Sequence, residues 1–331
     1  MNLATRAREA AAQAMRTSLL ALSHRRWLGR LAVRMPLSRQ VVGRFIAGQE
    51  LGEALQVLAR IQRDGYHTTL DVLGEAVSSP EQARAAADRY VAALEALSAG
   101  GLEGNVSLKL TQMGLDVGRE LCRENVARIF EKAALTGAFV RIDMEDHART
   151  DATLALWREL RPLNPSSGVV IQSALRRSEA DVARLIEERA RVRLCKGAYH
   201  EPEAVAFQAK TEVDAAYARL MERLLHEGEY PAFATHDARL IQQAVDIARR
   251  EGIGRDSFEF QMLFGVRRDL QRQLVDAGYA VRVYVPYGSE WYPYYMRRLA
   301  ERPANVAFIV GSLLTEAERA ARQRLGRIRR K

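Results

Sequence analysis

The feature that most constrains this chain is an alternation of short β-rich runs with long helical segments between residues 66 and 288. The runs favour β-strands, and the segments between them, rich in Ala, Leu, Arg and Glu, favour helices. We therefore expect eight strands and seven crossover helices. The expected strands are residues 67–74, 104–111, 138–144, 168–173, 191–198, 231–236, 257–263 and 280–288.

Eight strand–helix units in roughly 250 residues fit a (β/α)8 TIM-type barrel better than an open doubly wound sheet. No GxGxxG follows the first strand, which argues further against a Rossmann fold. Helices are expected to begin near three capping residues, Ser79, Ser178 and Asp237. We expect a distorted barrel with three parts. They are an N-terminal helical extension (1–65), a catalytic barrel that includes a final helix over the barrel mouth (66–312) and a basic helical tail (313–331).

Composition removes several classes of protein. Of the 331 residues, 48% are hydrophobic and 27% are charged, which allows a sizeable core and excludes bulk disorder. Cys122 and Cys195 lie 73 residues apart, which excludes a disulfide scaffold and a cysteine zinc site. Six scattered histidines show no metal-ligand spacing, so no metal is predicted. No apolar run approaches the ~18–20 residues of a membrane span, and we expect a soluble or peripheral protein.

The formal charge of +9 is unevenly distributed. Residues 1–49 carry +8 and residues 319–331 carry +7, so the body between them is acidic, at −6. A nucleic-acid-binding protein is more often basic over its whole folded surface, and no nucleic-acid partner is predicted. Basic ends on an acidic body suit an anionic membrane surface or a docking partner. The alternative is a pair of solvated, arginine-rich helices.

Polar residues recur where the expected strands end. In a (β/α)8 barrel the catalytic groups project from the carboxyl ends of the strands, so these residues are candidates for a site. Several strands also alternate polar with apolar residues, and the apolar set must face the helices, which leaves the polar set pointing into the barrel. The polar strand-end residues are Asp71, Glu75, Lys109, Asp143, Gln172, Lys196, Thr235, His236, Gln261 and Tyr284.

The expected barrel interior contains more cations than carboxylates, which predicts an anionic ligand. The cations are Arg141, Arg193, Arg282, Lys109 and Lys196, facing Asp143, Glu259 and Glu75. Two of only five lysines in the chain end barrel strands, among 45 arginines, which indicates a need for a compact ammonium group there. After the last strand, Arg297 and Arg298 lie beside an aromatic cluster, WYPYY, and form a candidate carboxylate clamp.

Seven motifs resemble those of the bacterial monofunctional proline dehydrogenases, in order, over about residues 60–310. They are VSLKLT (106–111), RIDMED (141–146), RLCKGAY (193–199), FATHD (233–237), FEFQMLFGVR (258–267), RVYVPYG (282–288) and WYPYYMRRLAERPAN (291–305). The resemblance implies an FAD-dependent enzyme that oxidises L-proline to Δ1-pyrroline-5-carboxylate. It implies that the electrons pass to ubiquinone or menaquinone, in the first step of proline degradation to glutamate. It also implies a cytoplasmic enzyme held peripherally at the inner face of the membrane.

The resemblance also implies roles for individual residues. Asp143, beside the substrate, and Arg193, near flavin N5, match the positions closest to the chemistry, where positive charge stabilises a reduced flavin. A second group matches substrate-binding positions: Lys109, Arg297 and Arg298 for the carboxylate, Tyr284 and Glu301 for the ring pocket, and Glu75 as a partner of Arg297. A third group matches flavin-binding positions: Met144, Gln172, Lys196, Gly197, Ala198, Tyr199, Thr235 and His236.

The chain departs from the family pattern in two places. Ala174 and Arg176 stand near the end of the fourth strand, where relatives usually have tyrosine, and Cys195 replaces an aliphatic residue. These changes affect the expected pocket width and flavin packing. Two other interpretations stay open. One is a Schiff-base aldolase that uses Lys109 or Lys196 as its nucleophile. The other is a non-enzymatic, basic-ended adaptor.

Overall fold

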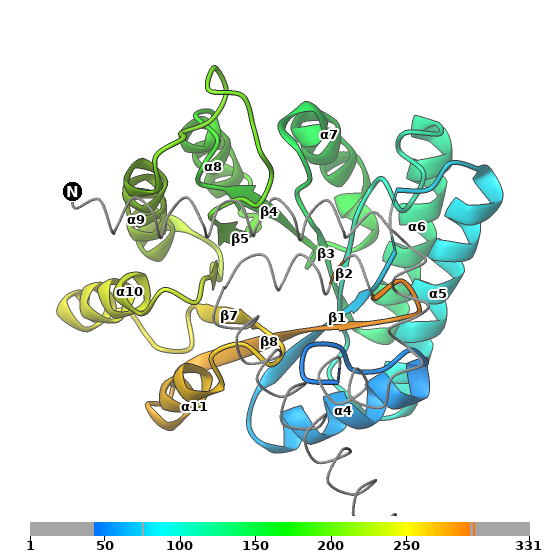
Figure 1. Cartoon of the computed structure of the whole chain (residues 1–331), viewed down its shortest axis with the longest axis horizontal. Coiled ribbons are helices and arrows are strands. Elements are labelled where there is room, and N and C mark those ends of the chain that lie inside the picture. The colour runs from blue at the N-terminus through cyan, green and yellow to red at the C-terminus, as the bar shows by residue number, and fades with distance from the viewer. Residues whose placement is uncertain (1–42, 75, 292–293, 295–331) are drawn as a thin grey trace, which may run out of the picture. The chain divides into compact units, whose positions relative to one another are not determined.

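The computed structural model describes residues 43–74, 76–291 and 294. The chain divides into two units, residues 47–288 and residues 1–46 with 289–331. The first unit is a closed barrel of eight strands, as predicted (Figure 1). Most of the predicted N-terminal extension, the helix after the last strand and the basic tail lie outside the described residues, and the domain boundaries stay predictions.

All eight strands are parallel, each pairs with the next along the chain, and the last closes on the first. The pairing is uneven: β1 and β8 share six residue pairs, from His67↔Arg282 to Val72↔Tyr287, whereas β3 and β4 share two. The strands are β1 (His67–Val72), β2 (Asn105–Leu108), β3 (Phe139–Ile142), β4 (Gly168–Gln172), β5 (Arg191–Cys195), β6 (Ala232–Ala234), β7 (Glu259–Leu263) and β8 (Ala280–Tyr287).

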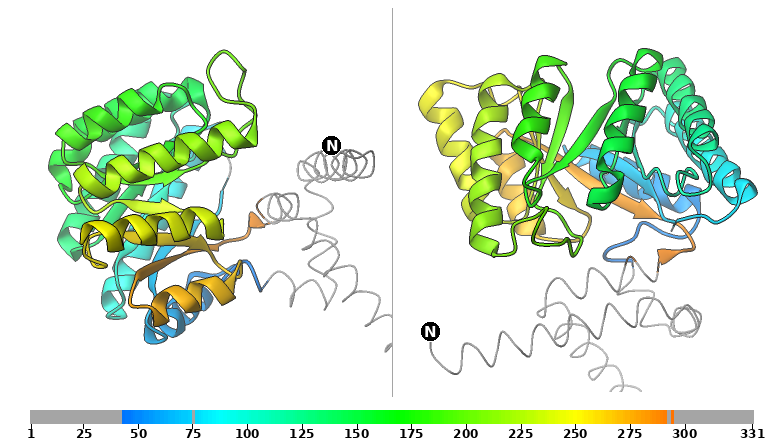
Figure 2. Two further views of the ribbon diagram at one scale, coloured as in Figure 1. Left: turned by 90° about the vertical axis from the view of Figure 1, so that its left-hand side faces the viewer. Right: turned by 90° about the horizontal axis from the view of Figure 1, so that it is seen from above.

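Seven α-helices connect successive strands and lie outside them (Figures 1 and 2). An eighth, α4 (Leu51–Arg63), precedes β1 and contacts β1 and β8, where the barrel closes. No helix in the described part of the chain is long and apolar enough to cross a membrane. The crossover helices are α5 (Pro80–Ala99), α6 (Arg119–Thr136), α7 (Thr150–Leu160), α8 (Ser178–Glu187), α9 (Lys210–Glu227), α10 (Ala238–Glu251) and α11 (Arg268–Asp276). Short 3₁₀ helices, η1 (His147–Arg149) and η2 (Arg161–Leu163), flank α7.

Two of the three predicted helix caps are confirmed. The Ser79 side chain accepts a hydrogen bond from the Gln82 backbone N–H at 3.3 Å, and the Asp237 side chain accepts one from the Arg239 backbone N–H at 3.1 Å. The prediction for Ser178 is wrong by one residue, because Ser178 is already helical. Its hydroxyl instead donates to the Gln172 carbonyl at 2.6 Å, which ties the start of α8 to the end of β4.

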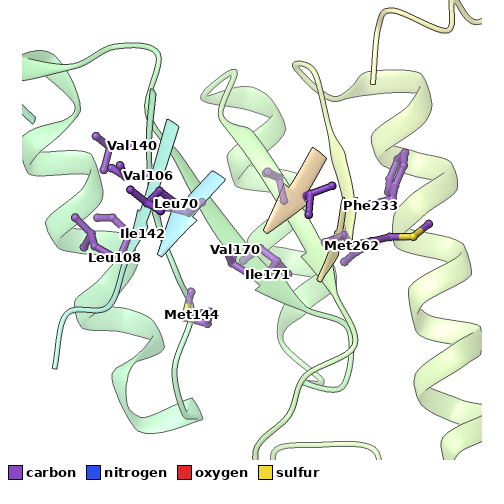
Figure 3. Packing of buried hydrophobic residues seen from close by; sticks show 14 of the residues in the cluster. Leu70, Val106, Leu108, Val140, Ile142, Met144, Val170, Ile171, Phe233 and Met262 are labelled. Atoms are coloured by element: carbon purple, nitrogen blue, oxygen red, sulfur yellow. The ribbon is translucent and has the colours of Figure 1, made fainter. Parts of the chain in front are cut away.

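The hydrophobic core lies between the strands and the helices. Outward-facing strand residues such as Leu70, Val106 and Ile142 pack there with the buried faces of the helices (Figure 3). Alternate residues of the same strands point into the barrel, and many of these are polar: Thr69, Asp71, Ser107, Arg141, Arg193, Glu259, Gln261 and Arg282 are all buried. The prediction that apolar strand residues face the helices and polar strand residues face the barrel interior is confirmed. This arrangement brings charged side chains from distant segments of the chain together.

Candidate active site

Four predicted site residues meet at the carboxyl end of the barrel. Lys109 and Asp143 directly follow β2 and β3, while Arg193 lies in β5 and Tyr284 in β8. Asp143 bonds to the other three. One of its oxygens accepts from the Tyr284 hydroxyl at 2.8 Å and from Lys109 Nζ at 3.2 Å. The other accepts from Arg193 Nη1 at 2.7 Å.

Asp71 is one of the predicted strand-end residues, and no role was predicted for it. Its carboxylate lies 3.3 Å from Lys109 Nζ, so the ammonium group bridges Asp71 and Asp143. Position alone could not reveal this pairing, because Asp71 and Lys109 lie 38 residues apart on neighbouring strands. We call Asp71, Lys109, Asp143 and Tyr284 the mouth cluster.

The charge states of the mouth cluster follow from burial and from the paired charges. Burial raises the pKa of Asp71 above its ordinary value despite the nearby Lys109 ammonium. Burial would also raise the pKa of Asp143, but Lys109 and Arg193 outweigh it and hold that pKa below its ordinary value. Burial opposes the charge of Lys109, yet Asp71 and Asp143 together raise its pKa. Lys109 is therefore a firmly protonated ammonium group at neutral pH.

The predicted excess of cations concerned the whole barrel interior; within this site the described cations and carboxylates are equal in number. Asp71 and Asp143 match Lys109 and Arg193 in charge. Asp71 was left out of the predicted set, and with it the five cations named there still outnumber the four carboxylates. Lys196 is also compensated, since its ammonium lies 2.5 Å from Asp214 and 3.2 Å from Asp237.

The residues predicted to bind flavin lie on the same rim, each at or just after a strand end. Gln172, the last residue of β4, donates to the Glu145 carbonyl at 2.8 Å. Met144, which precedes Glu145 in the chain, is buried. After β6, Thr235 Oγ1 accepts from the Asp237 backbone N–H at 3.1 Å. His236 Nε2 accepts from the Leu263 backbone N–H at 3.0 Å, so this nitrogen carries no proton.

The KGAY loop after β5 approaches the end of β4 closely. Gly197 has φ +106°, a conformation that L side chains rarely adopt. A Cβ at this position would lie 3.2 Å from Gln172 Oε1 and 3.3 Å from Ala174 Cβ, so the space suits glycine. Ala198 and Tyr199 follow and are exposed, with Tyr199 at 46%. Exposed backbone that directly follows Lys196 is a suitable setting for a phosphate-bearing cofactor with a hydrogen-bonding ring system.

The departures from the family pattern are accommodated locally. Arg176 lies with its guanidinium 4.7 Å from the Phe207 ring centre and donates to the Glu203 carbonyl at 3.2 Å, so it packs against the loop between β5 and α9. Burial raises the pKa of the Cys195 thiol to about 12, so this thiol is protonated at neutral pH. Glu75, Arg297, Arg298 and Glu301 lie outside the described residues.

A second ionic group lies toward the amino ends of the strands. Arg282 Nε donates to both oxygens of Glu259, at 2.9 and 3.1 Å, and Arg282 Nη1 donates to Glu103 at 2.8 Å. The side chains of Arg282 and Glu259 are 6% and 2% exposed. Burial would raise the pKa of Glu259, but Arg282 and Gln261 outweigh it and lower that pKa to about 2. We call Glu103, Glu259 and Arg282 the floor cluster.

The fold and the mouth cluster define a (β/α)8 barrel with an ionic site at its carboxyl end, the place where enzymes of this fold carry out their chemistry. Comparison with known proteins identifies the family. The family model described as "Proline dehydrogenase" matches residues 54–310. The chain therefore belongs to the proline dehydrogenase family, and it is an oxidoreductase.

Curated relatives and solved structures agree with this assignment. The chain is 44% identical over 276 residues to proline dehydrogenase of Deinococcus radiodurans, covering 82% of this chain and 89% of the relative. It is 40% identical over 271 residues to proline dehydrogenase 2 of Bacillus subtilis, again covering 82% and 89%. Proline utilization A of Bdellovibrio bacteriovorus, inactivated by N-propargylglycine, matches with a TM-score of 0.74 and 28% identity. This match covers 79% of the chain and 32% of that larger protein.

Proposed function

We propose that this chain oxidises L-proline to Δ1-pyrroline-5-carboxylate, using FAD, and passes the electrons to a membrane quinone. Family membership supports the reaction. The observation that carries the proposal is the mouth cluster, where a protonated lysine, an ionised carboxylate and a tyrosine hydroxyl converge at the active-site end of the barrel. A small zwitterion such as proline needs groups of both charges to bind and orient it.

Lys109 is assigned to the proline carboxylate, together with Arg297 and Arg298. Its raised pKa keeps it charged, and its side chain is 30% exposed, so a carboxylate can reach it. Tyr284 is held by its hydrogen bond to Asp143 and shapes the ring pocket with Glu301. Glu75 is assigned as the partner of Arg297.

The same charge state argues against the aldolase interpretation. A Schiff-base lysine must lose its proton to attack a carbonyl group, and such lysines have lowered pKa values. Asp71 and Asp143 raise the pKa of Lys109 instead, and Lys196 lies between Asp214 and Asp237. Lys109 is therefore not in a setting that favours the free amine.

The rim residues suit FAD. Lys196, Gly197, Ala198 and Tyr199 are assigned to the cofactor, and the close approach at Gly197 leaves room for backbone contact. Met144, Gln172, Thr235 and His236 are assigned to it from the neighbouring strand ends. Arg193 is assigned to the side of flavin N5, where its charge stabilises the reduced form. When bound, FAD supplies the two-electron oxidant for the C5–N bond of proline.

Proline oxidation gives a direct test. Purified full-length protein should show flavin absorbance in the visible range that bleaches anaerobically on addition of L-proline. Lys109→Met should retain the flavin spectrum but need a much higher proline concentration for bleaching, because the carboxylate loses a charged partner. A colourless protein, or a flavin that proline does not bleach, would contradict the proposal. A quinone analogue added after bleaching should restore the oxidised spectrum.

We also propose peripheral attachment to the inner face of the cytoplasmic membrane through the two basic ends. The support is the charge of +8 in residues 1–49 and +7 in residues 319–331. Each basic residue near an anionic surface contributes on the order of 1 kcal/mol at low salt. Co-sedimentation with liposomes should therefore favour anionic over neutral vesicles, weaken with salt, and weaken further when residues 319–331 are deleted. Equal sedimentation with both kinds of vesicle would contradict this attachment.

A further inference from the structure

Arg193 is held at every nitrogen by a side chain from a different strand or strand end. Its Nη1 donates to Asp143 at 2.7 Å, its Nη2 donates to Ser107 Oγ at 3.0 Å, and its Nε donates to Gln261 Oε1. The Tyr284 ring lies beside the guanidinium, with 5.3 Å between the Arg193 Cζ and the ring centre. Only 6% of the Arg193 side chain is exposed. These contacts fix both the position and the plane of the guanidinium group.

Gln261 differs from the other partners because it also bonds to the floor cluster. Its Nε2 donates to Glu259 Oε1, the same oxygen that accepts from Arg282 Nε at 2.9 Å. Gln261 and Glu259 are 4% and 2% exposed. A continuous chain of buried hydrogen bonds therefore runs from Arg282 through Glu259 and Gln261 to Arg193. A partly buried hydrogen bond continues it to Asp143 in the mouth cluster.

The two ends of this chain determine which way the Gln261 amide points. Arg193 can only donate, so it requires the amide oxygen. Glu259, with its pKa lowered to about 2, is ionised and can only accept, so it requires the amide nitrogen. A glutamate at position 261 would offer no donor to Glu259, and a methionine would offer neither partner a hydrogen bond. A neutral amide between a carboxylate and a guanidinium satisfies both.

We infer that Gln261 is a positioning residue for Arg193, with Glu259 and Arg282 fixing the direction of its amide. The consequence for catalysis rests on the proposed function, in which Arg193 lies beside the flavin. The floor cluster fixes the orientation of the Gln261 amide, and Gln261 in turn fixes the position of the Arg193 guanidinium. Ser107 and Asp143 restrain the other end of that guanidinium, but Asp143 also bonds Lys109 and Tyr284 and is shared among them.

The test measures the restraint of Arg193 separately from the reaction. In full-length protein labelled with ¹⁵N-arginine, the Arg193 Nε–H signal is assigned by its loss in Arg193→Lys. We expect this proton to exchange slowly with solvent in the native chain and at least about tenfold faster in Gln261→Met, because Nε loses its partner and opens more often. In the same variant, kcat for proline oxidation should fall on the order of 10- to 100-fold, with a smaller change in KM.

Swapping the residue types at positions 259 and 261 tests the direction of the Gln261 amide. Gln261→Glu should be impaired, because two carboxylates then face each other. The double variant Glu259→Gln with Gln261→Glu keeps the total charge and reverses the roles: the amide at 259 accepts from Arg282 and donates to the carboxylate at 261, which accepts from Arg193. In the double variant, the Arg193 Nε–H proton should again exchange slowly with solvent, and kcat for proline oxidation should rise back toward the native value. A core that was merely disturbed would be worse after two changes than after one.

A matched control removes another buried amide. Asn125 on α6 is 1% exposed and donates to the Met113 carbonyl at 3.0 Å, with no contact to Arg193. Asn125→Leu should leave the Arg193 signal and kcat unchanged even if the chain is less stable. Unchanged exchange in Gln261→Met, or a double variant no better than Gln261→Glu, would overturn the inference. Faster exchange with unchanged kcat would overturn the catalytic consequence alone. Absence of proline oxidation by the native chain would overturn the proposed function, while the exchange measurements still decide the role of Gln261.

Discussion

The barrel encloses two ionic clusters that differ in how far their central cations are exposed. In the floor cluster, Arg282 donates to Glu259 and Glu103, and the side chains of Arg282 and Glu259 are at most 6% exposed. In the mouth cluster, Lys109 is 30% exposed and bridges two carboxylates whose pKa values move in opposite directions, up for Asp71 and down for Asp143. The floor has a buried ion pair, Arg282 with Glu259, that stabilises the fold, while Glu103 at its edge is 34% exposed. The mouth keeps a partly exposed ammonium group that a bound ligand can reach.

Breaking the floor cluster should have the largest effect. Arg282→Met leaves Glu259 buried without its main partner, and removing one member of a buried pair costs about 3–5 kcal/mol. We expect a loss of this size in the free energy of unfolding, measured by urea denaturation. The double variant Arg282→Met with Glu259→Leu should recover much of it, because no buried charge is left unpaired. If the double variant is less stable than the single one, the floor depends on more than charge compensation.

Removing the cation of the mouth cluster should affect function more than folding. Lys109→Met should lower kcat/KM for proline, because a charged hydrogen bond to the substrate carboxylate is lost. The decrease should correspond to about 2–4 kcal/mol of transition-state stabilisation. The free energy of unfolding should change much less, because Asp71, whose pKa is already raised, can take up a proton. Steady-state kinetics and urea denaturation of the same preparation give both quantities. A loss of stability as large as that of Arg282→Met would show that the two clusters do not differ as described.

Much of the fold and part of the site could be predicted from the sequence. The barrel was predictable because the alternation of strands and helices is local. Lys109, Asp143 and Tyr284 were predictable because they lie at or near the carboxyl ends of strands in a fold that gathers those ends. Which partner each one contacts could not be predicted: Lys109 and Tyr284 lie 175 residues apart, and their distance depends on barrel closure. Gln261 stood among the strand-end residues, but its role requires knowing that Glu259 and Arg193 lie on either side of it.

Acid should weaken the floor cluster in a defined pH range. The pKa of Glu259 is lowered from an ordinary value of 4.5 to about 2, so its ionised form binds Arg282 more tightly in the folded chain than in the unfolded one. The stability that it contributes is complete above pH 4.5 and is lost as the pH falls toward 2. This contribution is on the order of 3 kcal/mol. Urea denaturation between pH 5 and pH 2 should show a steeper loss for the native chain than for Glu259→Gln, and equal slopes would contradict the assignment.

The smallest effect is expected at Asp71, and its sign is opposite to that of Glu259. Burial raises the pKa of Asp71 above its ordinary value of 3.8, so the folded chain binds this proton more tightly than the unfolded chain. Stability is therefore lost as the pH rises through the folded pKa, and ionised Asp71 is a cost at neutral pH. Asp71→Asn keeps the shape and an acceptor for Lys109, and it should be as stable as the native chain at pH 7, or more stable by up to about 1 kcal/mol. Glu259→Gln should lose stability at the same pH. If Asp71→Asn loses as much as Glu259→Gln, the ion pairs of the mouth stabilise the fold as much as those of the floor, and Lys109 is not held ready for a ligand.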